Sequence, residues 1–140
     1  ALVDFHKWVQ EKKLPGGGHP GTIDDRIPRC AKDRGFPVPQ YIQCQGPDLE
    51  ILKAACAAGR MPSVTYSRSP TGRYGGSRIS HMVNLVHADD KWFAVLDNNY
   101  IGEDAIEWMT PAEFGKTYSP GWAVILLDPA PPPPPKGNRP

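Results

Sequence analysis

One histidine and one aspartate, His81 and Asp97, stand where two neighbouring strands could bring them together. They lie in a segment, residues 79–99, in which hydrophobic and polar residues alternate on both sides of the turn residues 88–90. If a three-residue loop closes this hairpin, His81 pairs directly with Asp97, and directly paired side chains have Cβ atoms about 4.5–5.5 Å apart. A carboxylate in this position fixes the tautomer of the imidazole, as a general base requires.

The length of the turn decides which side chain meets His81. A two-residue turn at 89–90 would place Asn98 opposite His81, and an amide can also orient an imidazole. Both registers are open, and we favour Asp97. His87 is expected on the same face near the turn, in a structural or exposed role. At about 3.3 Å per residue the two histidines stand roughly 20 Å apart, so one metal ion bound by His81, His87 and Asp97 is not expected.

The three cysteines, Cys30, Cys44 and Cys56, form no CxxC pair and have no metal-ligand spacing with the four histidines. Their odd number argues against a complete disulfide framework, and the compartment stays open. Cys30 and Cys56 fall late in predicted helices, where a buried structural role is expected. Cys44 precedes a predicted helix start, which favours a thiolate, so Cys44 is a weak candidate nucleophile.

The composition limits the classes of partner. The chain has 140 residues, with 16 Lys and Arg against 15 Asp and Glu and a net charge of +1. This balance gives no electrostatic reason to expect nucleic acid or an anionic membrane as partner. Its apolar runs are far shorter than the roughly 20 residues that cross a bilayer, so no membrane span is expected.

Residue periodicity predicts helices first and an antiparallel sheet afterwards. Helical spacing covers residues 1–13, 22–34 and 47–59, and the segment 110–113, Thr-Pro-Ala-Glu, has the form of a capping box that starts a further short helix. Alternation with a period of two marks strands at 61–66, 79–87, 91–97, 105–109 and 121–127, with a polar, glycine-rich loop at 67–77. The prediction is an α+β fold with a sheet of about four or five strands.

Changes in composition divide the chain into three parts. Residues 1–20 form a helix and a glycine-rich loop, residues 21–128 the helix and sheet part, and residues 129–140 a proline-rich tail. The five prolines at 131–135 favour polyproline II, and we interpret them as a spacer rather than as a ligand for a proline-recognising module.

The order of these segments resembles the papain-like cysteine peptidases, in particular the bacterial peptidases that trim double-glycine leader peptides. Residues 81–86, His-Met-Val-Asn-Leu-Val, are similar to the histidine strand of that family, and residues 95–97, Val-Leu-Asp, to its aspartate strand. The resemblance covers residues 20–127. It implies helices packed on an antiparallel sheet, peptide-bond hydrolysis of a peptide or protein substrate, His81 and Asp97 (or Asn98) as catalytic residues, and no metal or cofactor.

The chain departs from the family pattern in two places. The family often has Asp-Pro where this chain has Asp97-Asn98. Its nucleophilic cysteine and its oxyanion glutamine precede the first helix, and residues 1–20 contain no cysteine. The nucleophile is therefore expected upstream of Ala1. The alternative is a catalytically inactive papain-like domain that binds a peptide or protein in a larger assembly. In either case a partner, or the preceding part of the chain, is expected to contact the first helix and the tail.

Overall fold

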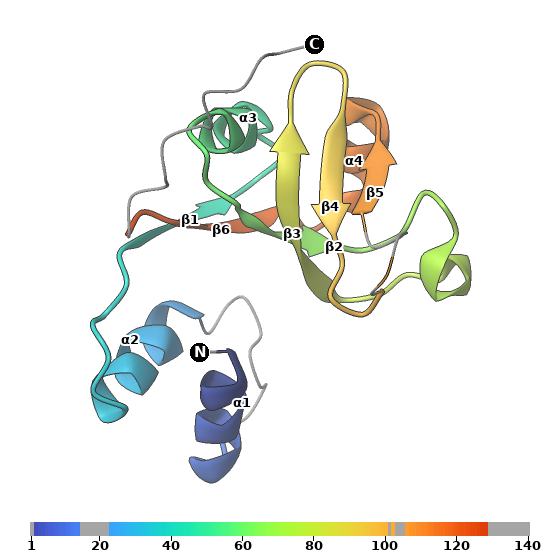
Figure 1. The fold of residues 1–140 in the computed structure, drawn as a ribbon. Helices are drawn as coiled ribbons and strands as arrows, with labels where there is room; N and C mark the ends of the chain where they lie inside the picture. Colours follow the sequence, from blue (N-terminus) through green and yellow to red (C-terminus); the bar gives the residue numbers. More distant parts are fainter. Residues whose placement is uncertain (1, 15–22, 101, 103–105, 129–140) are drawn as a thin grey trace. The chain divides into compact units, whose positions relative to one another are not determined.

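The computed structural model describes residues 2–14, 23–100, 102 and 106–128, without side-chain detail for residues 2–6 and 23–25. These residues belong to two compact units, one within residues 1–40 and one within residues 41–140. The first unit consists of helices, and the second contains the sheet (Figure 1). Helices in the described part of the chain are too short or too polar to span a bilayer.

The first unit is a pair of helices, α1 (Leu2–Glu11) and α2 (Ile23–Asp33), which confirms the two helices predicted there. Its small core surrounds Trp8, which is buried and packs with Val9 and Cys30. The indole Nε1 of Trp8 donates to Asp33 over 2.9 Å, and Arg34 pairs with Glu11 over 2.7 Å. Among the side chains that the structure describes, the ring of Trp8 and these polar contacts join α1 to α2.

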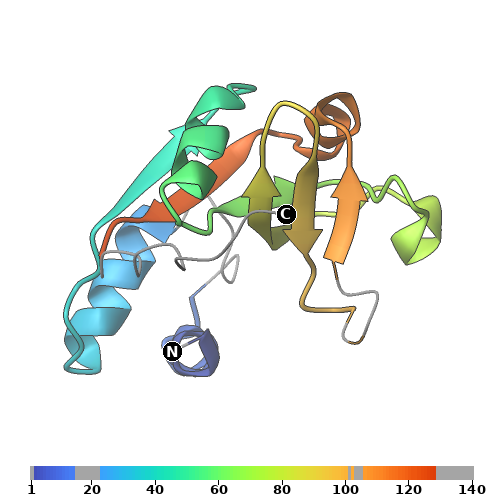
Figure 2. The same ribbon diagram turned by 45° about the horizontal axis from the view of Figure 1, so that its top comes forward.

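The second unit is built on a six-stranded antiparallel sheet with the order β1-β6-β2-β3-β4-β5. Its strands are β1 (Tyr41–Gln45), β2 (Ser63–Tyr66), β3 (His81–Ala88), β4 (Phe93–Leu96), β5 (Ile106–Met109) and β6 (Trp122–Leu126). Figure 2 shows the twist of this sheet, with β1 and β6 inclined to β3, β4 and β5. The α+β class is confirmed.

The predicted number of strands, about four or five, is wrong because β1 belongs to the sheet. Residues 41–45 are not among the predicted strands, since pairing with β6, about eighty residues later, leaves no local pattern. The amide of Gly46 donates to the carbonyl of Gly121 over 2.8 Å. A Cβ added to Gly121 would lie 2.9 Å from the carbonyl oxygen of Gly46. Glycine at 121, with φ +86°, permits this close approach.

Two helices, α3 (Glu50–Ala57) and α4 (Pro111–Thr117), contribute to the same buried cluster as the sheet. Leu52 of α3 and Phe114 of α4 are fully buried there, and the ring of Phe114 stacks on that of Phe93 with centroids 4.5 Å apart. α4 starts at the predicted capping box: the Thr110 hydroxyl accepts from the Glu113 amide, and the Glu113 carboxylate accepts from the Thr110 amide.

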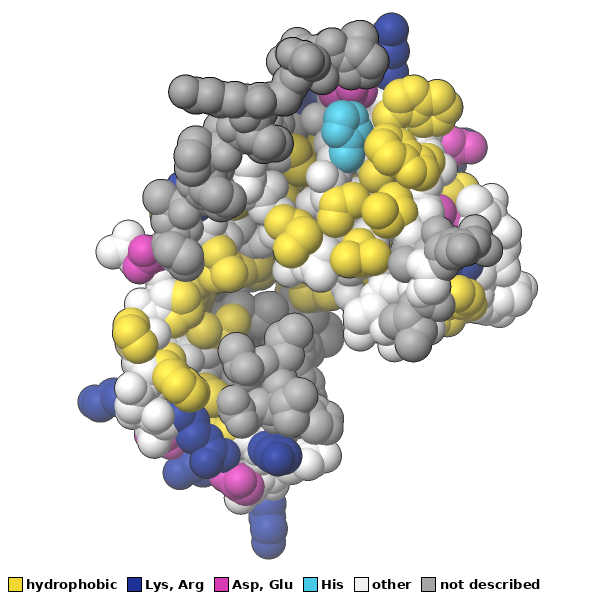
Figure 3. Space-filling model, viewed as in Figure 1, with side chains coloured by type: hydrophobic (Ala, Val, Ile, Leu, Met, Phe, Trp, Pro, Cys, Tyr) yellow, Lys and Arg dark blue, Asp and Glu magenta, His cyan; other side chains and the backbone are white. Residues whose placement is uncertain are grey.

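The face of the sheet opposite to the buried cluster carries hydrophobic side chains that are exposed. Exposed hydrophobic side chains gather on the face of this unit seen in Figure 3. The expectation that the N-terminal helices pack on the sheet concerns two separate units and stays a prediction. The proline-rich tail, 129–140, lies outside the described residues.

Candidate active site

His81 and Asp97 meet at one end of the β3–β4 hairpin. His81 is the first residue of β3, and Asp97 directly follows β4. The imidazole Nε2 lies 2.9 Å from Oδ1 of Asp97. The strands pair Asn84 with Leu96, so Asp97 falls opposite Val83, and His81 is its diagonal neighbour on the same face.

Neither predicted register is correct, although the predicted contact forms. The turn contains four residues, 89–92, instead of three or two, because Ala88 pairs with Phe93. The carboxylate of Asp89 accepts from the amides of Lys91 and Trp92, each over 2.7 Å, and this side chain stabilises the longer turn. Asn98, the alternative partner of His81, is exposed, and the imidazole contacts the carboxylate of Asp97 instead.

A β-bulge between Leu85 and His87 moves His87 to the other face of the sheet. Val83 and Leu85 are buried on the core side, and beyond the bulge Ala88 takes the buried position instead of His87. The His87 ring lies 5.5 Å from that of Trp108, and its Nε2 lies 3.2 Å from Asp89. The expectation that His87 shares a face with His81 is wrong, because the extra residue reverses the alternation.

Asp97 is a fully buried carboxylate with three hydrogen-bond donors. The Tyr74 hydroxyl donates to Oδ2 over 2.6 Å, while Oδ1 accepts from the Asn99 amide over 3.0 Å and faces His81 Nε2. Burial raises the pKa of Asp97, but the hydrogen bonds from Tyr74, Asn99 and His81 outweigh it, so the pKa lies below its ordinary value. Asp97 is therefore ionised at neutral pH.

An ionised Asp97 fixes the tautomer of His81. A carboxylate only accepts, so Nε2 of the imidazole carries the hydrogen and Nδ1 of the neutral ring is left as a proton acceptor. The side chain of His81 is 21% exposed, compared with 0% for Asp97, so the ring is accessible while its orienting group is sealed. A partly exposed imidazole that is held by a buried carboxylate can exchange a proton with a nucleophile or a substrate.

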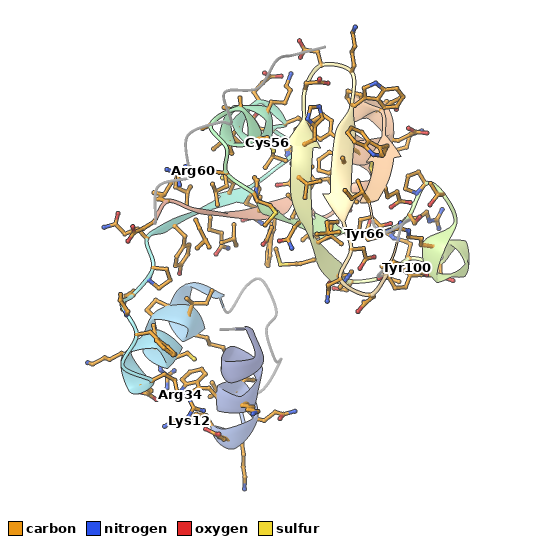
Figure 4. The ribbon with its side chains drawn as sticks, viewed as in Figure 1. Lys12, Arg34, Cys56, Arg60, Tyr66 and Tyr100 are labelled. Atoms are coloured by element: carbon orange, nitrogen blue, oxygen red, sulfur yellow. The ribbon has the colours of Figure 1, made fainter. Side chains whose placement is uncertain are left out.

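Two tyrosine rings lie against the imidazole, and a third packs on one of them. Tyr66 and Tyr74 present ring edges or faces to it, with centroids 6.5 and 6.0 Å from that of His81. Tyr100 packs on Tyr74 at 5.1 Å, and its hydroxyl accepts from the Tyr74 amide over 2.9 Å. Figure 4 labels Tyr66 and Tyr100, which come from β2 and from the segment after β4.

Sequence reasoning missed Tyr74 because it lies in the segment read only as a polar loop. The short 3₁₀ turn η2 (Arg73–Gly76) holds it, and its backbone is left-handed, with φ +59°. Burial, followed by the hydrogen bond to Asp97, raises the pKa of Tyr74 to about 12, so its hydroxyl stays a donor at neutral pH. A large aromatic residue among loop glycines was the available signal.

A second buried carboxylate, Glu107 of β5, fixes the loop that carries Tyr74. Its oxygens accept from the hydroxyls of Tyr66, Ser69 and Thr71, and the Thr71 amide approaches at 3.3 Å. Burial raises the pKa of Glu107, and these hydrogen bonds, Ser69 first, lower it to below its ordinary value. Sequence reasoning placed Glu107 in a strand without a role, since its partners lie some forty residues away.

None of the three cysteines has the surroundings of an activated thiolate. Burial, with the charge of Asp48, raises the pKa of Cys44, and burial raises that of Cys56 to about 11. β1, β6, β2 and β3 are successive strands, so about three strand spacings, roughly 14 Å, separate Cys44 from the strand of His81. Cys30 belongs to the core of the other unit.

Within the part of the chain that the structure describes, His, Cys, Asp and Glu side chains form no group of three or more suited to holding a metal ion. Comparison of the chain with protein-family models, with curated proteins and with solved structures gives no match.

Proposed function

We propose that this chain is the His- and Asp-bearing part of a papain-like cysteine peptidase whose nucleophilic cysteine lies upstream of Ala1. The observation that carries the proposal is the 2.9 Å contact between His81 Nε2 and the fully buried Asp97. This contact supports a general base with a fixed tautomer, and the raised pKa values of Cys44 and Cys56 support a nucleophile from elsewhere.

In the proposed reaction His81 takes the thiol proton at Nδ1, and the thiolate attacks the carbonyl carbon of the scissile peptide bond. Asp97 stabilises the imidazolium through the Nε2–H bond, without itself taking the proton. The imidazolium then gives the proton to the leaving amine as the C–N bond breaks. Water, activated by the same imidazole, hydrolyses the thioester and restores the cysteine.

The test is made on the chain extended upstream by its natural sequence, with iodoacetamide as the probe. We expect one rapidly alkylated cysteine in the added segment, together with peptide cleavage. His81→Ala should abolish both the cleavage and the rapid alkylation at neutral pH while leaving the far-UV circular dichroism unchanged, and His87→Ala, at the exposed face, serves as the matched control. Full cleavage by the His81→Ala protein would remove His81 from the mechanism.

The second candidate is a catalytically inactive domain of the same fold that binds a peptide or protein. The observation favouring it is that no cysteine of this chain combines a suitable position with a lowered pKa. An upstream segment without a cysteine, or with one that iodoacetamide labels at the ordinary rate, would decide for the binding domain.

A further inference from the structure

A line of exposed hydrophobic side chains crosses the face of the sheet opposite to its buried core. We name it the apolar stripe, and its members are Met61, Val86, Trp92, Ile106, Trp108 and Leu126, all exposed. Strand alternation assigns the members that lie in strands to this face, since Ile106 and Trp108 alternate with the buried residues Glu107 and Met109. Trp92, the last residue of the turn, directly precedes the buried Phe93.

The strand registers place members of the stripe opposite one another on neighbouring strands. Arg60, labelled in Figure 4, donates to the carbonyl of Leu126 over 2.7 Å. This bond sets the next residue, Met61, beside the end of β6. The amide of Leu85 donates to the carbonyl of Pro62 over 2.8 Å, so Met61 falls opposite Val86.

The same row of paired residues continues across β4 to β5. Beyond the bulge, His87 pairs with Ala94, and Ala94 pairs with Trp108. The hydrophobic side chains in Figure 3 form a band over this part of the sheet, beside a histidine. The stripe thus begins at Leu126, at the end of β6, and reaches Trp108 and Trp92.

We propose that the proline segment of this chain, residues 131–135, binds along the apolar stripe and ends against Trp92 and Trp108. The stripe crosses four strand spacings from β6 to β5, about 19 Å. A polyproline II segment rises about 3.1 Å per residue, so residues 129–135 extend over about 22 Å. Residues 129–135 start three residues after Leu126, and the five prolines start five residues after it, so the point of departure and the combined length both match the stripe.

The chemistry of the two partners is complementary. Trp92 and Trp108 are 47% and 53% exposed, which leaves much of each indole open to a proline ring. Proline has no backbone N–H, but its carbonyl is a free acceptor for an indole N–H. Polyproline II is also stiff before it binds, so little conformational entropy is lost, as in other aromatic surfaces that recognise proline.

The experiment uses the full 140-residue chain with 5-fluorotryptophan, whose four ¹⁹F resonances are assigned by Trp→Phe substitution. Changing all five prolines at 131–135 to serine should shift the resonances of Trp92 and Trp108 and leave that of buried Trp8 unchanged. Adding a synthetic peptide of residues 129–140 to this variant should restore the original positions. Superimposable spectra of the two proteins would overturn the proposal.

A second measurement keeps the prolines and changes the stripe. In Trp108→Ala the backbone amides of residues 136–139 should gain mobility in ¹⁵N relaxation. Phe36→Ala, which removes a ring with the same 53% exposure from the other unit, should leave them unchanged. Equal mobility in both variants would overturn the proposal. So would a Trp108 shift that depends on protein concentration, because the stripe would then bind a second copy of the chain.

Discussion

Tyr74 and His81 hold the two oxygens of one buried carboxylate. The Tyr74 hydroxyl donates to Oδ2 of Asp97 over 2.6 Å, and His81 Nε2 faces Oδ1 at 2.9 Å. Because the tyrosine comes from η2 and the histidine from β3, Asp97 joins a loop to the sheet. The orientation of the imidazole therefore depends on a residue that does not touch its nitrogens.

Tyr74→Phe tests this dependence. The substitution removes one of the three donors to a buried carboxylate, and leaving such a group short of a partner costs about 1–3 kcal/mol. We expect a loss of this size in urea unfolding at pH 7. The same change at Tyr118, a buried tyrosine at the end of α4, is the control and should cost less. Equal losses would mean that the Tyr74 bond adds nothing specific.

Asp97 predicts a definite dependence of stability on pH. Its pKa is lower in the folded chain than the value of about 3.9 expected when unfolded, so it stabilises the fold above that value. This contribution is lost as the pH falls through the lower, folded pKa. The difference in unfolding free energy between the original protein and Asp97→Asn should thus be largest near neutral pH and shrink below about pH 4. A difference that stays constant down to pH 2 would contradict the prediction.

Glu107→Gln should loosen the loop between β2 and β3. The amide nitrogen of glutamine cannot accept from the hydroxyls of Ser69, Thr71 and Tyr66, so part of the network is left unpaired. Hydrogen exchange at the amide of Thr71, which donates to Glu107, should accelerate about tenfold or more, equivalent to 1.4 kcal/mol. Glu50→Gln, at an exposed helix position, should not change it.

Alkylation of the 140-residue chain should reveal no hyper-reactive cysteine. Burial raises the pKa of Cys56 to about 11 and raises that of Cys44, so both are protonated at pH 7. Their rates with iodoacetamide, followed by mass spectrometry, should rise with pH from 7 to 9 as the thiolate fraction grows. Rapid and selective labelling of Cys44 at pH 6 would show that the nucleophile is present in this chain.

Local patterns in the sequence determined most helices and strands. The capping box at Thr110 and Glu113 acts over three residues, and period-two alternation marks each hairpin strand, because these interactions are made between near neighbours. The predicted and observed hairpin registers at His81 differ by two residues. A shift by an even number of residues keeps His81 and Asp97 on one face, so the predicted contact forms although the predicted turn length is wrong.

The tertiary structure decided what depended on distant partners. The pairing of β1 with β6, the bulge that turns His87 away and the donors that Tyr74 and Ser69 bring to buried carboxylates join segments far apart in sequence. A buried carboxylate is stable only when such donors converge on it, and the packed sheet, rather than any local pattern, brings them together.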